Sequence, residues 1–435
     1  MEEKRDLTIL TDSSLGVRAQ ARPPVALVIC DDPCTDLGRL TTDRCKAALP
    51  FAGKYRLIDF ALSNCVNSDI ETVGVITQYK PRSLHSHVAY GRPWDLDRTK
   101  GGLTLLHPYQ ARAEMDWYTG SANAVYQNQN FFLRHKTGEV LILVGSQVCT
   151  MDFTPMISRH REAQADLTIA VVHTDKTPPA QHYTLEISGK GFIKKVLPPR
   201  TDQPTAAALM GVLLFSTEAL NWRLGEDALC EDSTHDLFRD VIPSMIQAGD
   251  RVIAFQHMGY WNSLQTTQDY WQAGMDLLGE SPPLNLQDAS WPIRTQFEIH
   301  PPTRVSSGAR IAHSLISEGC IVDGTVEYSI LSPGVSIAPG AVVRHAIVMH
   351  NTSIEERAWV ENAILDMDTI VGPQSHVGKS YRQAPTVREK TPVQLTIVQK
   401  GTRIPAQQTV EPPPETSDWL LTQQQDLSNR HADAA

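Results

Sequence analysis

The chain has 435 residues, of which 41% are hydrophobic and 20% are charged, as expected for a globular protein with more than one domain. No apolar run approaches the roughly 20 residues of a membrane-spanning helix, and the polar, acidic N-terminus does not resemble a signal peptide. A formal net charge of −10 argues against general nucleic-acid binding. We therefore expect no nucleic-acid partner and no membrane partner. Because the seven cysteines are scattered and odd in number, we expect a reducing, cytoplasmic location.

The N-terminal two thirds of the chain are expected to alternate strands and helices. Short, continuous apolar runs predict buried strands at residues 25–30, 72–76, 140–144 and 167–172. Helix-like stretches lie between them, for example at 59–67 and 122–135. This alternation is typical of βαβ units and predicts an α/β fold with a mostly parallel sheet that is covered on both faces. We place this domain at residues 23–285, after a mobile N-terminal arm of residues 1–22.

A different pattern begins after Pro301-Pro302, where small apolar residues recur with a period near six. Examples are Ile337, Val343 and Met349. A six-residue period is the signature of a left-handed parallel β-helix, in which each side of a triangular coil uses one hexapeptide. A β-sandwich of short strands is the alternative. The expected boundaries are a linker at 286–303, the β-helix at 304–400 and a disordered tail rich in Pro, Gln and Asp at 401–435.

Four blocks of sequence resemble a known family. Residues 44–79 read RCKAALPFAGKYRLIDFALSNCVNSDIETVGVITQY, and shorter blocks are WYTGSANAV at 117–125, STHD at 233–236 and WPIRT at 291–295. They closely resemble bacterial ADP-glucose pyrophosphorylases, and the similarity extends over nearly the whole patterned chain. The resemblance implies a Rossmann-like nucleotidyltransferase domain, a C-terminal β-helix, a tetramer and a role in glycogen biosynthesis. In that family ATP and glucose 1-phosphate give ADP-glucose and pyrophosphate, under control of sugar phosphates and adenylates.

The phosphate-binding loop of that family is replaced in this chain. The resemblance places a Gly-Gly-x-Gly-x-Arg-Leu loop directly after the first strand, where small residues let backbone amides approach the triphosphate. This chain has Asp31, Asp32 and Cys34 at the glycine positions and Asp36 at the arginine position. Three carboxylates would repel ATP, and Pro33 removes one amide donor. We therefore expect weak binding of ATP.

Both aspartates that bind the metal in the family are also replaced. The resemblance places one after an Ala-Gly-Asp strand end and one after a Tyr-Trp-Arg stretch, where this chain has Ser146 and Ser263. Mg²⁺ relies on carboxylates and substrate phosphates, which neutral serines cannot replace. A metal held from another direction by Asp31, Asp32 or Asp152 is the alternative. We expect no catalytic residue, no metal site and no cofactor, with Mg²⁺ needed only if activity is retained.

The sites for sugar phosphate and effector are partly preserved. The family's Glu-Lys-Pro element falls on residues 196–198, which read VLP, so that Lys194 and Lys195 could compensate only if the strand register shifted. Two further departures are Asp43, which replaces a family lysine, and Pro50, which replaces a histidine. The residues that match the substrate pocket are Lys46, Tyr118, Gly120 and Gly211. Those that match the effector site or its route to the active site are Arg44, Arg56, Gln78, Ser83 and Trp117.

Two clusters of possible metal ligands are interpreted as structural. Cys30 ends a buried strand, so we expect it and the nearby Cys34 and Cys45 to be structural thiols. His85 and His87 are expected on the solvated face of a helix.

Lost chemistry and retained architecture together favour a non-catalytic or weakly active regulatory subunit of glucose-1-phosphate adenylyltransferase. Such a subunit would form a hetero-tetramer with a catalytic homologue, or a homo-tetramer, with sugar phosphates or adenylates as effectors. The alternatives are a weak but genuine adenylyltransferase and a free-standing sugar-phosphate sensor. A second family member in the same genome, with an intact loop and both aspartates, would favour the regulatory subunit.

Overall fold

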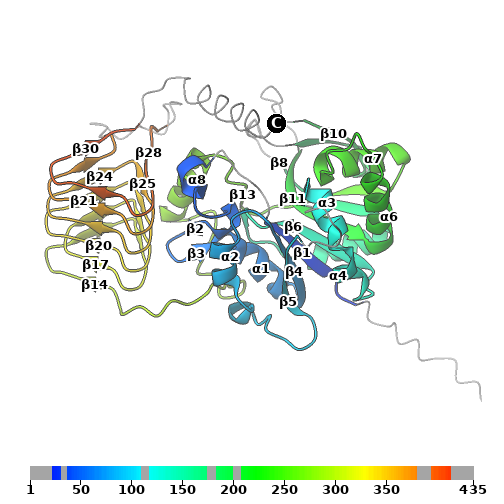
Figure 1. Cartoon of the computed structure of the whole chain (residues 1–435), viewed down its shortest axis with the longest axis horizontal. Helices are drawn as coiled ribbons and strands as arrows, with labels where there is room; N and C mark the ends of the chain where they lie inside the picture. Colours follow the sequence, from blue (N-terminus) through cyan, green and yellow to red (C-terminus); the bar gives the residue numbers. More distant parts are fainter. Residues whose placement is uncertain are drawn as a thin grey trace, which may run out of the picture.

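The chain forms an α/β domain followed by a parallel β-helix. The computed structural model describes residues 22–30, 37–108, 117–173, 183–198, 207–379 and 393–412. In Figure 1 the α/β domain occupies the centre and right, and the coils of the β-helix are stacked at the left. The replaced loop residues Asp31, Asp32, Cys34 and Asp36 and most of the predicted N-terminal arm lie outside the described residues.

The α/β domain is built on one nine-stranded sheet. Its strands are β1 (Val25–Cys30), β4 (Thr72–Thr77), β5 (Gly102–Leu106), β6 (Glu139–Val144), β8 (Leu167–His173), β9 (Thr184–Ile187), β10 (Ile193–Leu197), β11 (Ala207–Ser216) and β12 (Val252–Gln256). The order is β10-β9-β11-β6-β1-β4-β5, and β8 pairs with both β11 and β12. All four predicted buried strands are present.

The sheet is mixed rather than mostly parallel. β1 is parallel to β4 and β6, and β4 is parallel to β5. β11 is antiparallel to its neighbours β6, β8 and β9. A buried apolar run looks the same in a parallel and in an antiparallel pair, so strand direction could not be predicted from these runs.

Helices cover both faces of the sheet. They are α1 (Leu57–Asn67), α2 (Arg82–Val88), α3 (Ser121–Gln127), α4 (Gln129–Leu133), α5 (Thr154–Ala163), α6 (Thr217–Ala228), α7 (Ile242–Ala248) and α8 (Thr267–Met275). Shorter helical turns are η1 (Gly38–Thr41), η2 (Lys46–Ala48), η3 (Arg92–Trp94), η4 (Leu237–Val241) and η5 (Asp276–Leu278). Side chains of β1 alternate between two apolar cores, one shared with α3, α4, α6 and α7 and the other with α1, α2 and α5.

Local hydrogen bonds set the helix boundaries. The backbone N–H of Arg56 donates to the Asp59 carboxylate at 2.8 Å, so that α1 begins two residues before the predicted start. The stretch predicted as one helix at 122–135 is divided at Asn128 into α3 and α4. Asn128 Nδ2 donates to the Tyr118 hydroxyl at 2.9 Å and to the carbonyl of Ala124 at 2.8 Å. The two hydrogen bonds of Asn128 therefore hold the Tyr118 side chain against α3.

The second part is a β-helix of three parallel sheets. Two sheets have six strands each, β14-β17-β20-β23-β26-β29 and β15-β18-β21-β24-β27-β30, and the third has five, β16-β19-β22-β25-β28. The strands are β14 (Arg304–Val305), β15 (Arg310–Ala312), β16 (Leu315–Ile316), β17 (Ile321–Val322), β18 (Thr325–Glu327), β19 (Ile330–Leu331), β20 (Ser336–Ile337), β21 (Val342–Arg344), β22 (Ile347–Val348), β23 (Ser353–Ile354), β24 (Trp359–Glu361), β25 (Ala363–Leu365), β26 (Ile370–Val371), β27 (His376–Val377), β28 (Thr396–Val398), β29 (Arg403–Ile404) and β30 (Thr409–Val410). The predicted architecture is confirmed.

The six-residue period holds along part of each coil only. Ile337 and Val343 fill the apolar interior, as predicted. Ile337 pairs in the next coil with Ile354, 17 residues later, so one coil is a residue shorter than three hexapeptides. The frame therefore slips, and Met349 packs against the α/β domain while Val348 faces the interior. The β-helix also continues through β29 and β30, so the prediction that the tail begins at residue 401 is wrong for residues 403–410.

A shared apolar core joins the two parts. Phe51 and Tyr270 of the α/β domain pack in one cluster with Ile347, Met349 and Ile364 of the β-helix. The Tyr270 hydroxyl donates to the carbonyl of Pro50 at 2.6 Å. The Trp271 indole N–H donates to the carbonyl of His345 at 2.8 Å. These contacts hold α8 between the β-helix and the rest of the α/β domain.

The predicted linker is anchored along part of its length. Trp291 Nε1 donates to Asn64 Oδ1 at 2.9 Å, and Arg294 Nη1 donates to Asn67 Oδ1, also at 2.9 Å. Both acceptors belong to α1, so the WPIRT block is fixed to the α/β domain before the chain reaches β14.

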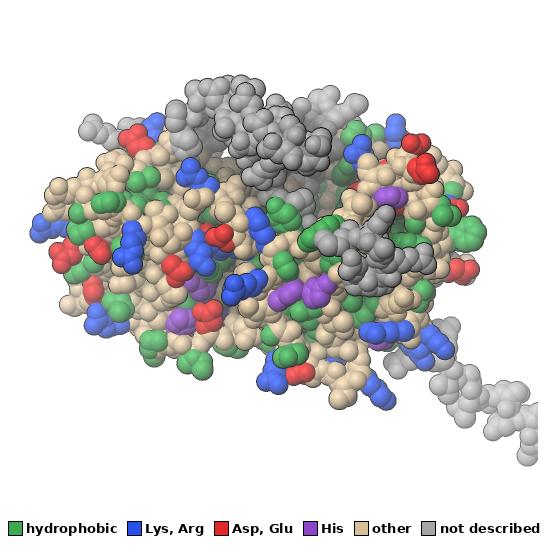
Figure 2. Space-filling model, viewed as in Figure 1, with side chains coloured by type: hydrophobic (Ala, Val, Ile, Leu, Met, Phe, Trp, Pro, Cys, Tyr) green, Lys and Arg blue, Asp and Glu red, His purple; other side chains and the backbone are tan. Residues whose placement is uncertain are grey.

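On the face seen in Figure 2, acidic and basic side chains are interspersed over the β-helix.

Candidate functional site

The parallel strands define the edge of the sheet at which a ligand is expected. β1, β4, β5 and β6 run in the same direction, so their carboxyl ends meet at one edge, where α/β sheets bind ligands. Gly145 follows β6 there, and its N–H donates to the carbonyl of Ile29 at 2.9 Å. A Cβ on Gly145 would lie 2.5 Å from Cys30 Sγ, so a side chain cannot fit between these strand ends.

The segments that carry Ser146 and Ser263 lie side by side at this edge. β7 (Val148–Cys149) pairs with β13 (Trp261–Asn262), and the Trp261 indole N–H donates to Gln147 Oε1 at 2.8 Å. Ser146 is buried, with 4% of its surface exposed. The structure therefore brings together the two segments in which the resemblance places metal-binding aspartates, and the serines there carry neutral hydroxyls.

The alternative carboxylate ligand serves a structural role. Asp152 Oδ1 accepts the N–H of Thr154 at 2.8 Å at the start of α5. In the part of the chain that the structure describes, no group of three or more His, Cys, Asp or Glu side chains could hold a metal ion. Asp31 and Asp32, the other carboxylates of that alternative, lie outside the described residues.

Two of the resembling blocks pack against each other around Gly120. The N–H groups of Ala122 and Asn123, in the first turn of α3, donate to the carbonyl of His235 at 2.8 and 3.3 Å. The Ser121 hydroxyl donates to the Asp236 carboxylate at 2.8 Å. Together these bonds tie the WYTGSANAV block to the STHD block and position Tyr118, which precedes α3.

Substitution of Gly120 by alanine is expected to destabilise this contact. A Cβ at Gly120 would lie 2.4 Å from the His235 carbonyl oxygen and 2.6 Å from that of Thr234, so the backbone must shift. We expect Gly120→Ala to lower the free energy of unfolding by about 1–3 kcal/mol, measured by urea denaturation. The matched control is Gly138→Ala, where a Cβ meets no atom within 4 Å and the loss should stay below about 0.5 kcal/mol. Equal losses in both variants would contradict the proposed clash.

The other remnants of the substrate pocket are also placed by packing. Lys46 lies in η2 and is 2% exposed. Gly211 adopts a φ of +73° where the pairing of β11 with β8 shifts register, and a Cβ there would lie 2.8 Å from Val144 Cγ2. Gly211 is thus required next to the end of β6, which accounts for it structurally.

The strand that carries Lys194 and Lys195 pairs irregularly with its neighbour. The pairing of β10 with β9 is irregular between Ile193 and Lys195, so that Lys195 lies opposite Glu186. Lys194 and Lys195 are both exposed, whereas Val196 and Leu197 are half-buried. Two exposed cations therefore lie at this irregularity, directly before residues 196–198, on which the resemblance places the Glu-Lys-Pro element.

The candidate effector residues fall into separate groups. Arg44 is 4% exposed, and its guanidinium forms an ion pair with Asp366 of the β-helix at 2.5 Å, so in this conformation it faces the interior. Arg56 Nη1 donates to the Ser83 hydroxyl at 2.8 Å. Gln78 exchanges two hydrogen bonds with the backbone of Tyr118, at 2.6 and 3.2 Å. Trp117 is 58% exposed.

Arg56 also lines a cavity of about 330 Å³ between the two parts of the chain. Burial lowers the pKa of Arg56, although Asp59 opposes this shift. Burial likewise lowers the pKa of His350 to about 4, so this lining histidine is neutral at physiological pH. The remaining charged lining side chains, which the sequence did not single out, include Lys54, Glu298, Glu318 and His300. They come from segments far apart in the chain.

The prediction that His85 and His87 lie on a solvated helix face is wrong for His87, which is buried, whereas His85 is half-buried. His87 is 7% exposed, and its Nε2 lies 2.6 Å from Asp59 Oδ1. His85 Nε2 lies 3.0 Å from the Thr77 hydroxyl, which is also 2.9 Å from His107 Nδ1. The sequence of α2 looks polar, but His87 meets the buried carboxylate of Asp59 and His85 meets the buried hydroxyl of Thr77. Cys30 and Cys45 are buried, and Cys34 lies outside the described residues.

Comparisons with known proteins agree with this architecture. The nucleotidyl transferase family matches residues 34–280, and a GlmU-like C-terminal hexapeptide family matches residues 301–398. A protein of Desulforamulus reducens named glucose-1-phosphate adenylyltransferase is 40% identical over 374 residues, which cover 84% of this chain and 92% of that protein. The chain belongs to the glucose-1-phosphate adenylyltransferase family.

Other members of the family are similar over the same extent. A glucose-1-phosphate adenylyltransferase of Bacillus cereus strain Q1 is 37% identical over 369 residues, which cover 82% of this chain and 97% of that protein. The corresponding protein of Bacillus anthracis is 36% identical over the same shares.

Among the described residues, no helix is both long and apolar enough to cross a membrane.

Proposed function

We propose that this family member is a non-catalytic or weakly active regulatory subunit of glucose-1-phosphate adenylyltransferase in glycogen biosynthesis. The observation that carries the proposal is that Ser146 and Ser263, near the edge of the sheet where the parallel strands end, have uncharged side chains. Ser146 and Ser263 stand on neighbouring segments where a transferase needs carboxylates for Mg²⁺. The replacement of the phosphate-binding loop by DDPCTDL acts in the same direction, because its carboxylates repel a triphosphate.

Effector binding is proposed at the cavity between the two parts of the chain. Lys54 and Arg56 supply positive charge, as a sugar phosphate or an adenylate requires. Glu318 lies 3.6 Å from Lys54 and Glu298 lies 3.2 Å from His300, so part of that charge is neutralised within the protein. Anionic effectors should therefore bind more weakly here than at a purely basic site. Arg44 would act through the contact with the β-helix.

The shared core offers a route by which effector binding could bias activity in an assembly. The cavity and the shared core are both lined by residues of the α/β domain and of the β-helix. A ligand in the cavity that alters the contact between these two parts therefore also alters how they pack. A subunit that does not bind ATP productively can still shift a two-state equilibrium of a mixed tetramer, if its contacts differ between the states.

Co-expression with a catalytic homologue from the same organism is expected to give a mixed tetramer. Its response to sugar phosphates and adenylates should differ from that of the homologue alone, measured by activity titration after co-purification through a tag on this chain. Arg56→Ala in this chain should reduce that difference, and Arg304→Ala, at an exposed position of the first coil, is the matched control. Two separate homo-oligomers, or unchanged effector curves, would contradict the regulatory role.

A weak but genuine adenylyltransferase is the second candidate. The observation that favours it is the irregularity in β10, which presents Lys194 and Lys195 as exposed cations directly before residues 196–198, on which the resemblance places the Glu-Lys-Pro element. Loss of a low, Mg²⁺-dependent activity on Lys195→Ala, in a preparation free of host enzyme, would support this candidate.

A further inference from the structure

Three aromatic side chains form a face-to-face stack at one corner of the β-helix. The rings of His313 and Tyr328 are 4.7 Å apart with an angle of 8° between their planes, and those of Tyr328 and His345 are 5.2 Å apart at 10°. Each residue directly follows a strand of the same sheet (β15, β18 and β21) and has a φ of 45° or 46°. The stack therefore rises coil by coil from His313.

The stack begins in the first coil, so one face of the His313 ring has no coil beneath it. β15, which precedes His313, is the first strand of its sheet. Among the described residues, the only aromatic ring stacked on His313 is that of Tyr328. His313 is exposed. Its second ring face is therefore turned away from the stack, on the side where this sheet has no further described strand.

This ring also lines a cavity of about 710 Å³ between the first coil and the segment after α8. Of the described β-helix residues, only His313, Ser314 and Leu315 line it, whereas the two rings above do not. The cavity therefore lies beside the start of the stack, at the level of the first coil. Its other walls are apolar side chains, Leu277, Leu278, Leu284 and Leu286, and polar groups that include Glu280, Asn285 and Gln287.

We propose that this cavity binds a planar heteroaromatic ring of nucleobase size that carries an amino group, stacked on the free face of His313. Flat rings favour offset stacking on one another, and leucine side chains supply apolar contact for the edges. Glu280 can accept a hydrogen bond from an exocyclic amino group, and the amides of Asn285 and Gln287 can donate or accept.

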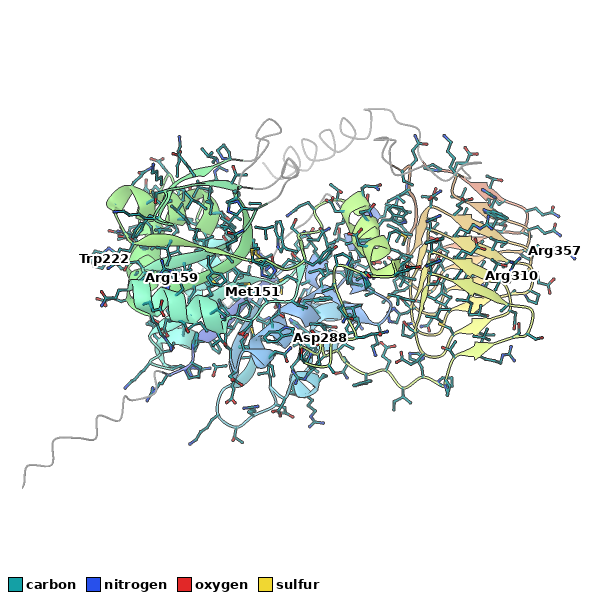
Figure 3. All side chains as sticks on the ribbon, turned by 180° about the vertical axis from the view of Figure 1, so that it is seen from behind. Met151, Arg159, Trp222, Asp288, Arg310 and Arg357 are labelled. Carbon is teal, nitrogen blue, oxygen red and sulfur yellow. The ribbon has the colours of Figure 1, made fainter. Side chains whose placement is uncertain are left out.

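The charges of the cavity select against phosphate. No lysine or arginine lines its described part, and its one carboxylate repels anions. Arg310 and Arg357 are labelled on the flank of the β-helix that faces away from the α/β domain in Figure 3. The ligand is thus a base or nucleoside rather than a nucleotide, and the site is distinct from both the replaced phosphate loop and the effector cavity.

Calorimetric titration of the full chain with adenosine tests the proposal without any measurement of activity. We expect one site per chain, a loss of affinity of about tenfold or more in His313→Ala, and retention in His313→Phe, which keeps a flat ring. The matched control is His376→Ala, because His376 stacks on Trp359 in another column of the same β-helix, outside the cavity. Its affinity should equal that of the unsubstituted chain.

The amino-group requirement has its own test. Inosine lacks the exocyclic amine, so adenosine should bind more tightly than inosine, and Glu280→Gln should reduce that preference. Binding that is unchanged in His313→Ala, the absence of binding at millimolar adenosine, or tighter binding of ATP than of adenosine at the His313-dependent site would overturn the proposal.

Discussion

Purified alone, the chain is expected to turn over ATP and glucose 1-phosphate at least about a hundredfold more slowly than the median enzyme rate of about 10 per second. The reason is electrostatic, because loss of one preorganised charged group already costs about a hundredfold or more in transition-state stabilisation. Here serines and aspartates stand where the resemblance places both metal-binding carboxylates and the phosphate cradle. Pyrophosphate release in the presence of Mg²⁺ measures the rate directly.

Two variants separate the contributions of the loop and the metal site. Ser146→Asp with Ser263→Asp restores two carboxylates on neighbouring segments, and should raise activity only if the loop at 31–37 is also returned to Gly-Gly-x-Gly-x-Arg-Leu. Binding of Mg-ATP, followed by calorimetry, should be weak in the unsubstituted chain and stronger in the combined variant. A rate near 10 per second without substitution, or micromolar Mg-ATP affinity that is lost on Asp32→Ala, would show that the electrostatic argument fails.

Removal of the Arg44 side chain is expected to cost about 3–5 kcal/mol of the free energy of unfolding. Arg44 and Asp366 are both buried, and Arg44→Ala leaves the carboxylate without its cation inside the protein. Urea denaturation measures the loss. The matched control is Arg304→Ala, which breaks an exposed ion pair with Asp323 at 3.5 Å and should cost no more than about 1 kcal/mol.

This comparison also distinguishes a structural Arg44 from an effector ligand. If the main role of Arg44 is to hold the β-helix against the α/β domain, Arg44→Ala should lower the free energy of unfolding to the same extent with and without sugar phosphate. A variant that folds with normal stability but loses the effector response would instead assign Arg44 to the effector site, and would contradict the pairing seen here.

The main elements of the fold were predictable because burial leaves a local pattern. The apolar run at Val25–Cys30 predicted a central strand, and β1 is indeed flanked by strands on both sides. Ile337 and Val343 likewise predicted the interior of the β-helix. Local pattern could not reveal that β11 is antiparallel, nor that a 17-residue coil shifts the frame at Met349, because both depend on how distant segments pair.

For the site, the sequence by itself determined which side chains stand at the positions that the resemblance assigns to metal and phosphate binding. The serines at 146 and 263 and the aspartates at 31, 32 and 36 are identities that no packing can change. Tertiary structure decided which retained residues are available to a ligand. Arg44 is removed from the surface by Asp366, 322 positions away, and His87 by Asp59 on a neighbouring helix. Burial of a charge depends on a partner brought close by folding, so one stretch of sequence cannot reveal it.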